Sequence, residues 1–169
     1  MARYDNGTTN YALLYVHSFR LIAPRKLLEA QRFIGQFHSA DDLSSMPERL
    51  RWHRHLLGFM QSEVADKVGV SRAVYADLEG GECKTCPSAL ADALAKLYQV
   101  SPEELLDDYN LFLYRGQARQ IQEYRKRSGL SCKAFSCVTG ISESSVKAWE
   151  KGKKQISRKA WEKYFKGKL

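Results

Sequence analysis

The sequence predicts an all-α protein in which two tandem copies of one small helical module follow an α-rich N-terminal extension. The main observation is an internal repeat: residues 50–81 and 121–152 align without a gap at an offset of 71 residues. The positions that are identical in the two copies are the pairs Arg54/Arg125, Gly58/Gly129, Gly69/Gly140, Ser71/Ser142, Glu79/Glu150 and Gly81/Gly152. A repeat of turn glycines and polar anchors at fixed spacing indicates two copies of one folding unit.

Apolar positions also recur in the two copies, and their spacing is helical. The matched pairs are Leu50/Ile121, Phe59/Leu130, Val64/Phe135, Val70/Ile141, Tyr75/Val146 and Leu78/Trp149. In the first copy, Val64 and Val68 lie one helical turn apart, as do Tyr75 and Leu78. This spacing predicts short amphipathic helices with one buried face each.

Residues 1–47 match neither copy and are predicted to form the N-terminal extension. Residues 1–10 are polar and are expected to be weakly held, and for Tyr11–Phe19 the pattern leaves a strand and a helix open. Arg25–His38 has apolar residues at helical spacing, so one helix is predicted there. Ser39–Pro47 is rich in turn formers and predicts a linker.

The first module, residues 48–108, is predicted to contain five helices separated by glycines and capping serines. Gly69 suits the left-handed turn at a helix end, and Ser71 suits the N-cap of the next helix. Ser101 and Pro102 are typical of a helix start. The predicted helices are Glu48–Leu57, Gln61–Val68, Arg72–Glu79, Ser88–Tyr98 and Pro102–Asp108.

A linker is predicted over residues 109–116, followed by a second module of four helices over residues 117–169. Ser131 and Ser142 are its predicted N-caps. This module lacks a counterpart of the fifth helix, so its core is expected to depend on the first module or on a second copy of the chain. Its predicted helices are Ala118–Arg127, Cys132–Thr139, Glu143–Glu150 and Ser157–Phe165.

Positive charge is concentrated in the second module. The chain has a net charge of +8, but residues 117–169 contain 14 Lys/Arg against 4 Asp/Glu, whereas residues 1–116 contain 13 against 15. The first module is acidic, with 7 Lys/Arg and 10 Asp/Glu in residues 49–108. A solvated basic face is one explanation of such a block, but an imbalance this large favours contact with phosphates.

The same composition argues against several other classes of protein. The longest apolar run, Ala12–Val16, is far shorter than the ~20 residues of a spanning helix, and the N-terminus does not have the pattern of a secretory signal. A cytoplasmic protein associated with the bacterial nucleoid, with no membrane partner, is therefore expected. No catalytic signature was found, so the chain is not expected to be an enzyme.

The four cysteines do not form a convincing metal site. Cys83 and Cys86 have zinc-ligand spacing. Cys132 and Cys137 are spaced differently, and no histidine lies near either pair in the sequence. The cysteines are interpreted as reduced thiols, because disulfides are rare in the cytosol. Neither a metal nor a cofactor is expected.

Each copy has the pattern of a helix-turn-helix: a helix of eight residues, a glycine, an apolar residue, a capping serine and a second helix. The glycine permits a steep angle between the helices, and the apolar residue (Val70 or Ile141) holds the turn to the core. The second helix of such a motif projects its N-terminal side chains into the major groove of DNA.

Both copies resemble the phage repressor and Cro family, also called the xenobiotic-response-element type. The strings that carry the resemblance are Gln61–Gly81 and Lys133–Gly152, and Tyr98–Leu106 resembles the fifth helix of that family. The resemblance covers residues 49–108 and 117–165. It implies two lambda-repressor-like helix-turn-helix domains in a sequence-specific transcriptional regulator, of the repressor kind.

The resemblance also assigns DNA contacts in the first module. Gln61 matches a glutamine that holds a backbone phosphate, and the positions facing bases are Arg72, Ala73 and Asp77. An arginine can bind guanine through two hydrogen bonds, worth about 1–3 kcal/mol of discrimination, so Arg72 is the leading base reader. Ala73 can contact only a thymine methyl. Asp77 departs from the family pattern, since a carboxylate repels phosphate or else accepts from a cytosine amino group.

In the second module the corresponding positions are Cys132, Glu143, Ser144 and Ala148, which are poor ligands for phosphate. Lysines surround them, namely Lys133, Lys147, Lys151, Lys153 and Lys154. This module is therefore expected to hold the DNA backbone, with Ser144 and Lys147 reaching bases. Neutralising several phosphates would make binding depend steeply on salt.

Two ion pairs are also implied by the resemblance, Arg54 with Glu79 and Arg125 with Glu150. Each would orient a recognition helix more than it stabilises the fold, because a buried ion pair often only breaks even. Trp52 lies off the Leu50/Leu57 stripe; packing in the core, against the N-terminal segment or against a partner all remain open.

The expected partner is double-stranded DNA, with a homodimer as a further expectation. A second hypothesis differs in what the acidic module does. In that antitoxin-like alternative only the basic C-terminal module touches DNA, while the first module or the N-terminal region holds a protein partner.

Overall fold

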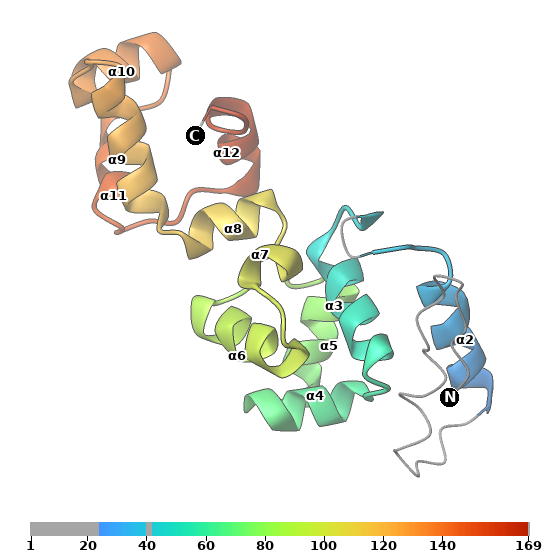
Figure 1. The fold of residues 1–169 in the computed structure, drawn as a ribbon. Helices are drawn as coiled ribbons and strands as arrows, with labels where there is room; N and C mark the ends of the chain where they lie inside the picture. The colour runs from blue at the N-terminus through green and yellow to red at the C-terminus, as the bar shows by residue number, and fades with distance from the viewer. Residues whose placement is uncertain (1–23, 40–41, 169) are drawn as a thin grey trace. The chain divides into compact units, whose positions relative to one another are not determined.

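The computed structural model of the chain describes residues 24–39 and 42–168, and it is all-helical there (Figure 1). Eleven helices and no strand occur in these ranges, which confirms the predicted all-α class. The structure divides into two compact units between Asp107 and Asp108. The expectations for residues 1–10 and Tyr11–Phe19 lie outside the described residues.

The helices of the first unit begin and end mainly where the sequence predicts. Its helices are α2 (Pro24–Ile34), α3 (Met46–Leu56), α4 (Gln61–Val68), α5 (Arg72–Gly80), α6 (Ser88–Tyr98) and α7 (Pro102–Leu105). Helix α3 begins earlier than predicted, because the Ser45 hydroxyl accepts from the backbone N–H of Glu48 while the Glu48 carboxylate accepts from that of Ser45. These two hydrogen bonds form a capping box, which satisfies otherwise unpaired donors.

A short turn sets the angle between α4 and α5. Gly69 ends α4 in the left-handed conformation, with φ of 74°, and the Ser71 hydroxyl accepts from the N–H of Val74 to begin α5. Helices α4 and α5 pack against α3 and α6 through buried apolar residues, and α7 contributes to the same core. These residues include Leu50, Val64, Ala65, Tyr75, Leu78, Leu94 and Leu105. The predicted helix-turn-helix geometry is thus present in residues 61–80.

Helix α2 packs on α3 within the first unit (Figure 1). Its Ile34 forms a small buried cluster with Leu43 and Trp52, which shows that Trp52 packs against the N-terminal extension. The predicted helix over Arg25–His38 ends early, at Ile34. The Asp42 carboxylate accepts from the backbone N–H groups of His38 and Ser39, so these donors are used outside a helix.

The second unit corrects the prediction of a linker over residues 109–116. These residues lie in or directly after helix α8 (Asp108–Tyr114), whose Tyr109 and Phe112 are buried in the core of the unit and pack against Trp161. The predicted helix over Pro102–Asp108 is divided, because Leu106 adopts an extended conformation after α7. The second unit therefore has five helices where four were predicted, and α8 supplies apolar area that its core was expected to lack.

The remaining helices of the second unit are α9 (Gln117–Arg127), α10 (Cys132–Thr139), α11 (Glu143–Glu150) and α12 (Arg158–Tyr164). Helices α9, α10 and α11 begin exactly 71 residues after α3, α4 and α5. Ser131, Ser142 and Ser157 accept from backbone N–H groups as N-caps. The repeat in the sequence thus corresponds to a repeat in helix positions.

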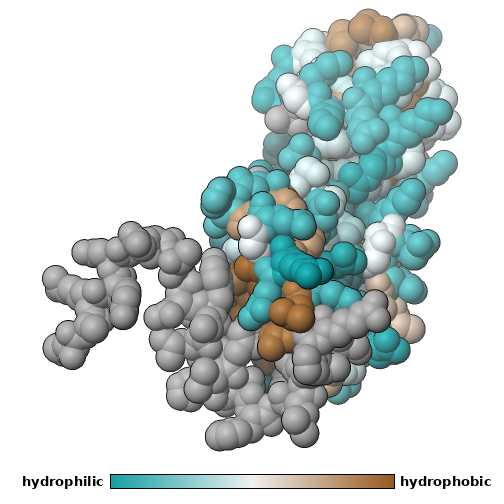
Figure 2. Space-filling model, turned by 90° about the vertical axis from the view of Figure 1, so that its right-hand side faces the viewer, coloured by the Kyte–Doolittle hydropathy of each residue, from teal (hydrophilic) through white to brown (hydrophobic). Residues whose placement is uncertain are grey.

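The described surface is mainly polar. On the face in Figure 2, hydrophilic residues cover most of it and hydrophobic ones appear in small areas. The exposed large apolar side chains are Leu28, Met60, Val74 and Val138. Within the described ranges, every helix is too short or too polar to span a bilayer.

Candidate nucleic-acid interface

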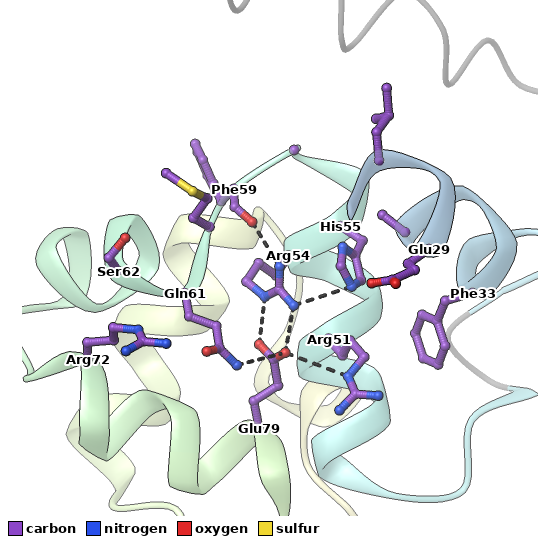
Figure 3. Close-up of a pocket in the computed structure, with 14 residues that line it drawn as sticks. Glu29, Phe33, Arg51, Arg54, His55, Phe59, Gln61, Ser62, Arg72 and Glu79 are labelled. Carbon is purple, nitrogen blue, oxygen red and sulfur yellow. Dashed lines mark hydrogen bonds and ion pairs between the residues drawn. The ribbon is translucent and has the colours of Figure 1, made fainter. Parts of the chain in front are cut away.

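The residues predicted to contact DNA in the first unit belong to helices α4 and α5. Arg72, Ala73 and Asp77 are all exposed on α5. Gln61 is the first residue of α4 and is half-buried. Gln61 and Arg72 line one cavity (Figure 3), whereas Ala73 and Asp77 are not among its lining residues. Gln61 and Arg72, each the first residue of its helix, therefore lie at one site, and Ala73 and Asp77 lie on α5 outside that cavity.

An ion pair between Arg54 and Glu79 connects α3 to the end of α5 (Figure 3). The Arg54 guanidinium donates through Nε to Oε2 of Glu79 at 2.7 Å and through Nη2 to Oε1 at 2.6 Å. Its Nη1 donates to the carbonyl of Phe59 at 2.9 Å. The Arg54 side chain therefore connects α3, which carries it, to the end of α5 and to the turn that leads to α4.

The pair stays charged although both side chains are buried. Burial raises the pKa of Glu79, but the hydrogen bonds and charge of Arg54 outweigh it, so the net shift lowers the pKa. For Arg54, burial acts to lower the pKa, and Glu79 reverses that effect, so the net shift raises it. Beneath the pair, the hydroxyls of Tyr75 and Tyr98 lie 2.7 Å apart, and burial raises the pKa of both tyrosines.

The second unit repeats this arrangement with the same atoms. Arg125 donates through Nε and Nη2 to the two carboxylate oxygens of Glu150, at 2.6 and 2.9 Å, and through Nη1 to the carbonyl of Leu130 at 2.7 Å. The hydrogen bonds to Glu150 raise the pKa of Arg125. Both ion pairs implied by the sequence are thus present, and each includes a backbone carbonyl that the sequence does not reveal.

The position of Gln61 is taken by Cys132 in the second unit, and both side chains contact the carboxylate of the ion pair. The Gln61 amide donates to Oε1 of Glu79 at 3.3 Å, and the Cys132 thiol donates to Oε2 of Glu150 at 3.9 Å. All four cysteines are free. In the described ranges, no three potential ligands gather as they would at a metal site.

The lysines predicted to hold the DNA backbone are all exposed, namely Lys133, Lys147, Lys151, Lys153 and Lys154, and so is Ser144. Lys147 is paired with Glu143 one turn earlier, with Nζ 2.7 Å from the carboxylate. The Ser144 hydroxyl lies 3.2 Å from that of Ser142, the helix cap. Lys147 and Ser144 would therefore exchange a local contact for a contact with DNA.

Comparison with known protein families gives a match for the first unit. Residues 47–107 match the family described as "Helix-turn-helix domain". These residues are therefore similar in sequence to a helix-turn-helix domain, in agreement with the left-handed turn at Gly69 and the Ser71 cap between α4 and α5. The family occurs in regulators of the xenobiotic-response-element type, so the match indicates DNA binding and a function in transcription regulation. Comparisons with curated proteins and with solved structures gave no match.

Within the helix-turn-helix domain, the sequence gives no signal for one further site residue, Arg51. Its Nε lies 3.6 Å from Oε1 of Glu79, the oxygen that also accepts from Gln61. The position equivalent to Arg51 in the repeat is Gln122, so the comparison of copies does not identify it. Only the packing of α3 beside α5 brings Arg51 to the helix-turn-helix site.

The basic loop after α11 is held by side chains that the sequence also left unassigned. Gln117 donates through Nε2 to the carbonyl of Lys154 at 2.7 Å and accepts through Oε1 from the N–H of Ile156 at 3.0 Å. The Tyr109 hydroxyl donates to the carbonyl of Ile156 at 2.6 Å. Outside the helix-turn-helix domain, therefore, α8 and the start of α9 fix the loop that carries Lys153 and Lys154.

Proposed function

We propose that the protein is a sequence-specific transcriptional repressor that binds double-stranded DNA through two helix-turn-helix modules, residues 48–107 and 117–169. The observation that carries the proposal is the repeated contact of Arg54 and Arg125. Each arginine joins a first helix, a turn carbonyl and the end of a second helix, at distances that agree within about 0.3 Å. Because the two modules have the same contacts at the same helix positions, we expect both to dock on DNA in the same orientation.

The two modules would make different kinds of contact with DNA. In the first, Arg72 reads a base at the N-terminal end of α5, with Ala73 and Asp77 beside it and Gln61 on the backbone. In the second, Lys133, Lys151, Lys153 and Lys154 neutralise phosphates, and Ser144 and Lys147 reach bases. Exposure of all these side chains except the half-buried Gln61 supports this assignment. Binding of two modules to adjacent half-sites would space those sites by about 34 Å, one helical turn.

Repression would follow from occupancy of an operator that overlaps the site of the polymerase. The chemistry needed is binding alone, so the proposed function assigns no catalytic residue and no cofactor. A homodimer would present four modules and lengthen the operator accordingly.

The charge distribution favours one alternative, in which only the basic second module contacts DNA. The first module has an excess of acidic residues, 10 against 7, and would then hold a protein partner, as in an antitoxin. Under this alternative Arg72 would be a solvated surface charge.

Selection of bound duplexes from a random pool tests the proposed function. Two enriched half-sites at a constant spacing are expected, and enrichment of no sequence would overturn the proposal. Charge reversals then separate the alternatives. Arg72→Glu and the pair Lys147→Glu with Lys151→Glu should each weaken binding, whereas an effect of the lysine changes alone would leave only the second module as a DNA reader.

A further inference from the structure

A cavity of about 460 Å³ lies in the first unit between α2 and the helix-turn-helix site (Figure 3). One wall comes from α2, through residues that include Glu29 and Phe33. The other walls come from α3, from the turn that follows it, from the N-terminal ends of α4 and α5, and from Glu79 near the end of α5. Gln61, Ser62 and Arg72 are among the lining residues, so the cavity adjoins the place where the proposed function puts the DNA backbone.

Arg51 and Arg54, two arginines that line this cavity, differ in how many of their N–H donors already have a partner. Arg54 is buried, and three of its nitrogens donate to Glu79 and to the Phe59 carbonyl. The Arg51 side chain is 46% exposed, and its Nε is 3.6 Å from Glu79, beyond ordinary hydrogen-bond length. Arg51 therefore retains donors for a ligand, while the charge of Glu79 is largely neutralised by Arg54.

Helix α2 holds Arg51 in this position. The Arg51 guanidinium carbon lies 5.6 Å from the centre of the Phe33 ring, within the range of a cation–π contact. Phe33 in turn packs against the buried cluster of Ile34, Leu43 and Trp52. The N-terminal extension thus supplies a supported aromatic face for one arginine of the site.

A backbone phosphate fits the groups that surround the cavity. The amide of Gln61, the hydroxyl of Ser62 and the guanidinium of Arg51 can each donate to phosphate oxygens. The charges among the lining residues are those of Arg51, Arg54 and Arg72 against Glu29 and Glu79, which leaves one positive charge. An anionic ligand is therefore favoured over a neutral or cationic one.

We infer that Arg51, positioned by Phe33 of α2, binds a phosphate of the DNA backbone beside Gln61. The inference rests on the proposed function and extends it, because it makes the N-terminal extension part of the DNA interface. The equivalent residue of the second unit is Gln122, which has no charge, so the contact belongs to the first module only.

The test measures binding of the full chain to two duplexes of equal length, the selected operator and a scrambled sequence, over a range of salt. Arg51→Gln should weaken binding to both duplexes about fivefold to tenfold at 0.1 M salt and should lower the slope of log K against log salt by about 0.9, as expected for the loss of one phosphate contact. Arg51→Lys keeps the charge and should retain most of the affinity and the slope. Phe33→Leu keeps an apolar side chain without the ring face and should give a smaller loss than Arg51→Gln.

Lys96→Gln provides the matched control, since Lys96 is exposed on α6 and does not line the cavity. It removes the same charge, so an equal effect of Lys96→Gln and Arg51→Gln would overturn the inference while leaving the proposed function intact. A loss confined to the operator would also overturn it, because a phosphate contact carries no sequence information. Failure of the unaltered chain to bind either duplex would instead refute the proposed function.

Discussion

Removal of the Glu79 carboxylate is expected to destabilise the first unit severely, because it would leave the Arg54 guanidinium buried without its partner. The two side chains are 11% and 1% exposed. Glu79 accepts two hydrogen bonds from Arg54, at 2.6 and 2.7 Å, and one from Gln61. Loss of one partner of a buried pair costs about 3–5 kcal/mol, and each hydrogen bond to a charged group contributes about 1.5–3 kcal/mol. The ion-pair value and the sum of the two hydrogen bonds from Arg54 therefore give a similar decrease in the free energy of unfolding for Glu79→Ala.

The loss can be measured for each unit separately by NMR during a urea titration. The chain has three tryptophans, and the indole N–H signal of Trp52 reports the first unit, while those of Trp149 and Trp161 report the second. Glu79→Ala should shift the Trp52 transition to lower urea by the equivalent of about 3–5 kcal/mol. The other two transitions should move little.

Two further variants make this reasoning refutable. Glu82→Ala removes an exposed carboxylate two residues past the end of α5 and should change stability by less than about 0.5 kcal/mol. Replacement of both partners, Arg54→Met with Glu79→Leu, should recover most of the loss, because apolar side chains can replace a buried ion pair at little net cost. A loss below about 1 kcal/mol in Glu79→Ala would refute the buried-charge argument.

Two other outcomes follow from the same structure. Burial, and then the charge of Arg54, lower the pKa of His55 to about 4. In the unfolded chain the histidine pKa is about 6.5, so the unfolded state binds the proton first as the pH falls. The free energy of unfolding should therefore fall from about pH 6.5 towards pH 4, by up to about 1.4 kcal/mol per pH unit. Urea midpoints of the Trp52 signal at pH 7 and pH 5 measure this, His55→Gln should reduce the difference, and equal midpoints in the unaltered chain would contradict it. Phe112→Ala should destabilise the second unit by about 3–5 kcal/mol, since Phe112 is buried against Trp161; a change below about 0.5 kcal/mol in the Trp161 transition would instead mark α8 as a mere linker.

Helix positions in both units were predictable because their signals are local. Gly69 and Gly140 end α4 and α10 in left-handed conformations, and serines cap the helices that follow. Helices α4, α10 and α11 therefore have their predicted bounds. Helix α6 also has its predicted bounds, with Pro87 before it and Gln99 in the left-handed conformation after it. The exposure of Arg72, Ala73 and Asp77 on α5 follows from the same pattern, since Tyr75 and Leu78 occupy the buried face.

Residues 109–116 were mispredicted because their role depends on partners far along the chain. Residues 109–114 are mostly apolar, but they lie between the two copies of the repeat and have no counterpart in it. Their buried contacts are made with residues about 50 positions later: Tyr109 and Phe112 pack on Trp161, and the Tyr109 hydroxyl donates to the carbonyl of Ile156. The early end of α2 has a local cause instead, since the Asp42 carboxylate accepts from the N–H groups of His38 and Ser39, four and three residues before it.

The all-α class and the two copies at an offset of 71 residues could be predicted from the sequence, because they depend on local helical spacing and on a repeat that can be counted. The partners of both ion pairs were implied by the resemblance to the phage repressor and Cro family. Two features became visible only in the folded chain: α8 completes the core of the second unit, and Arg51 and Gln61 both approach Oε1 of Glu79. Those contacts join residues that are distant in sequence, and their geometry depends on how helices pack, which no short pattern of residues encodes.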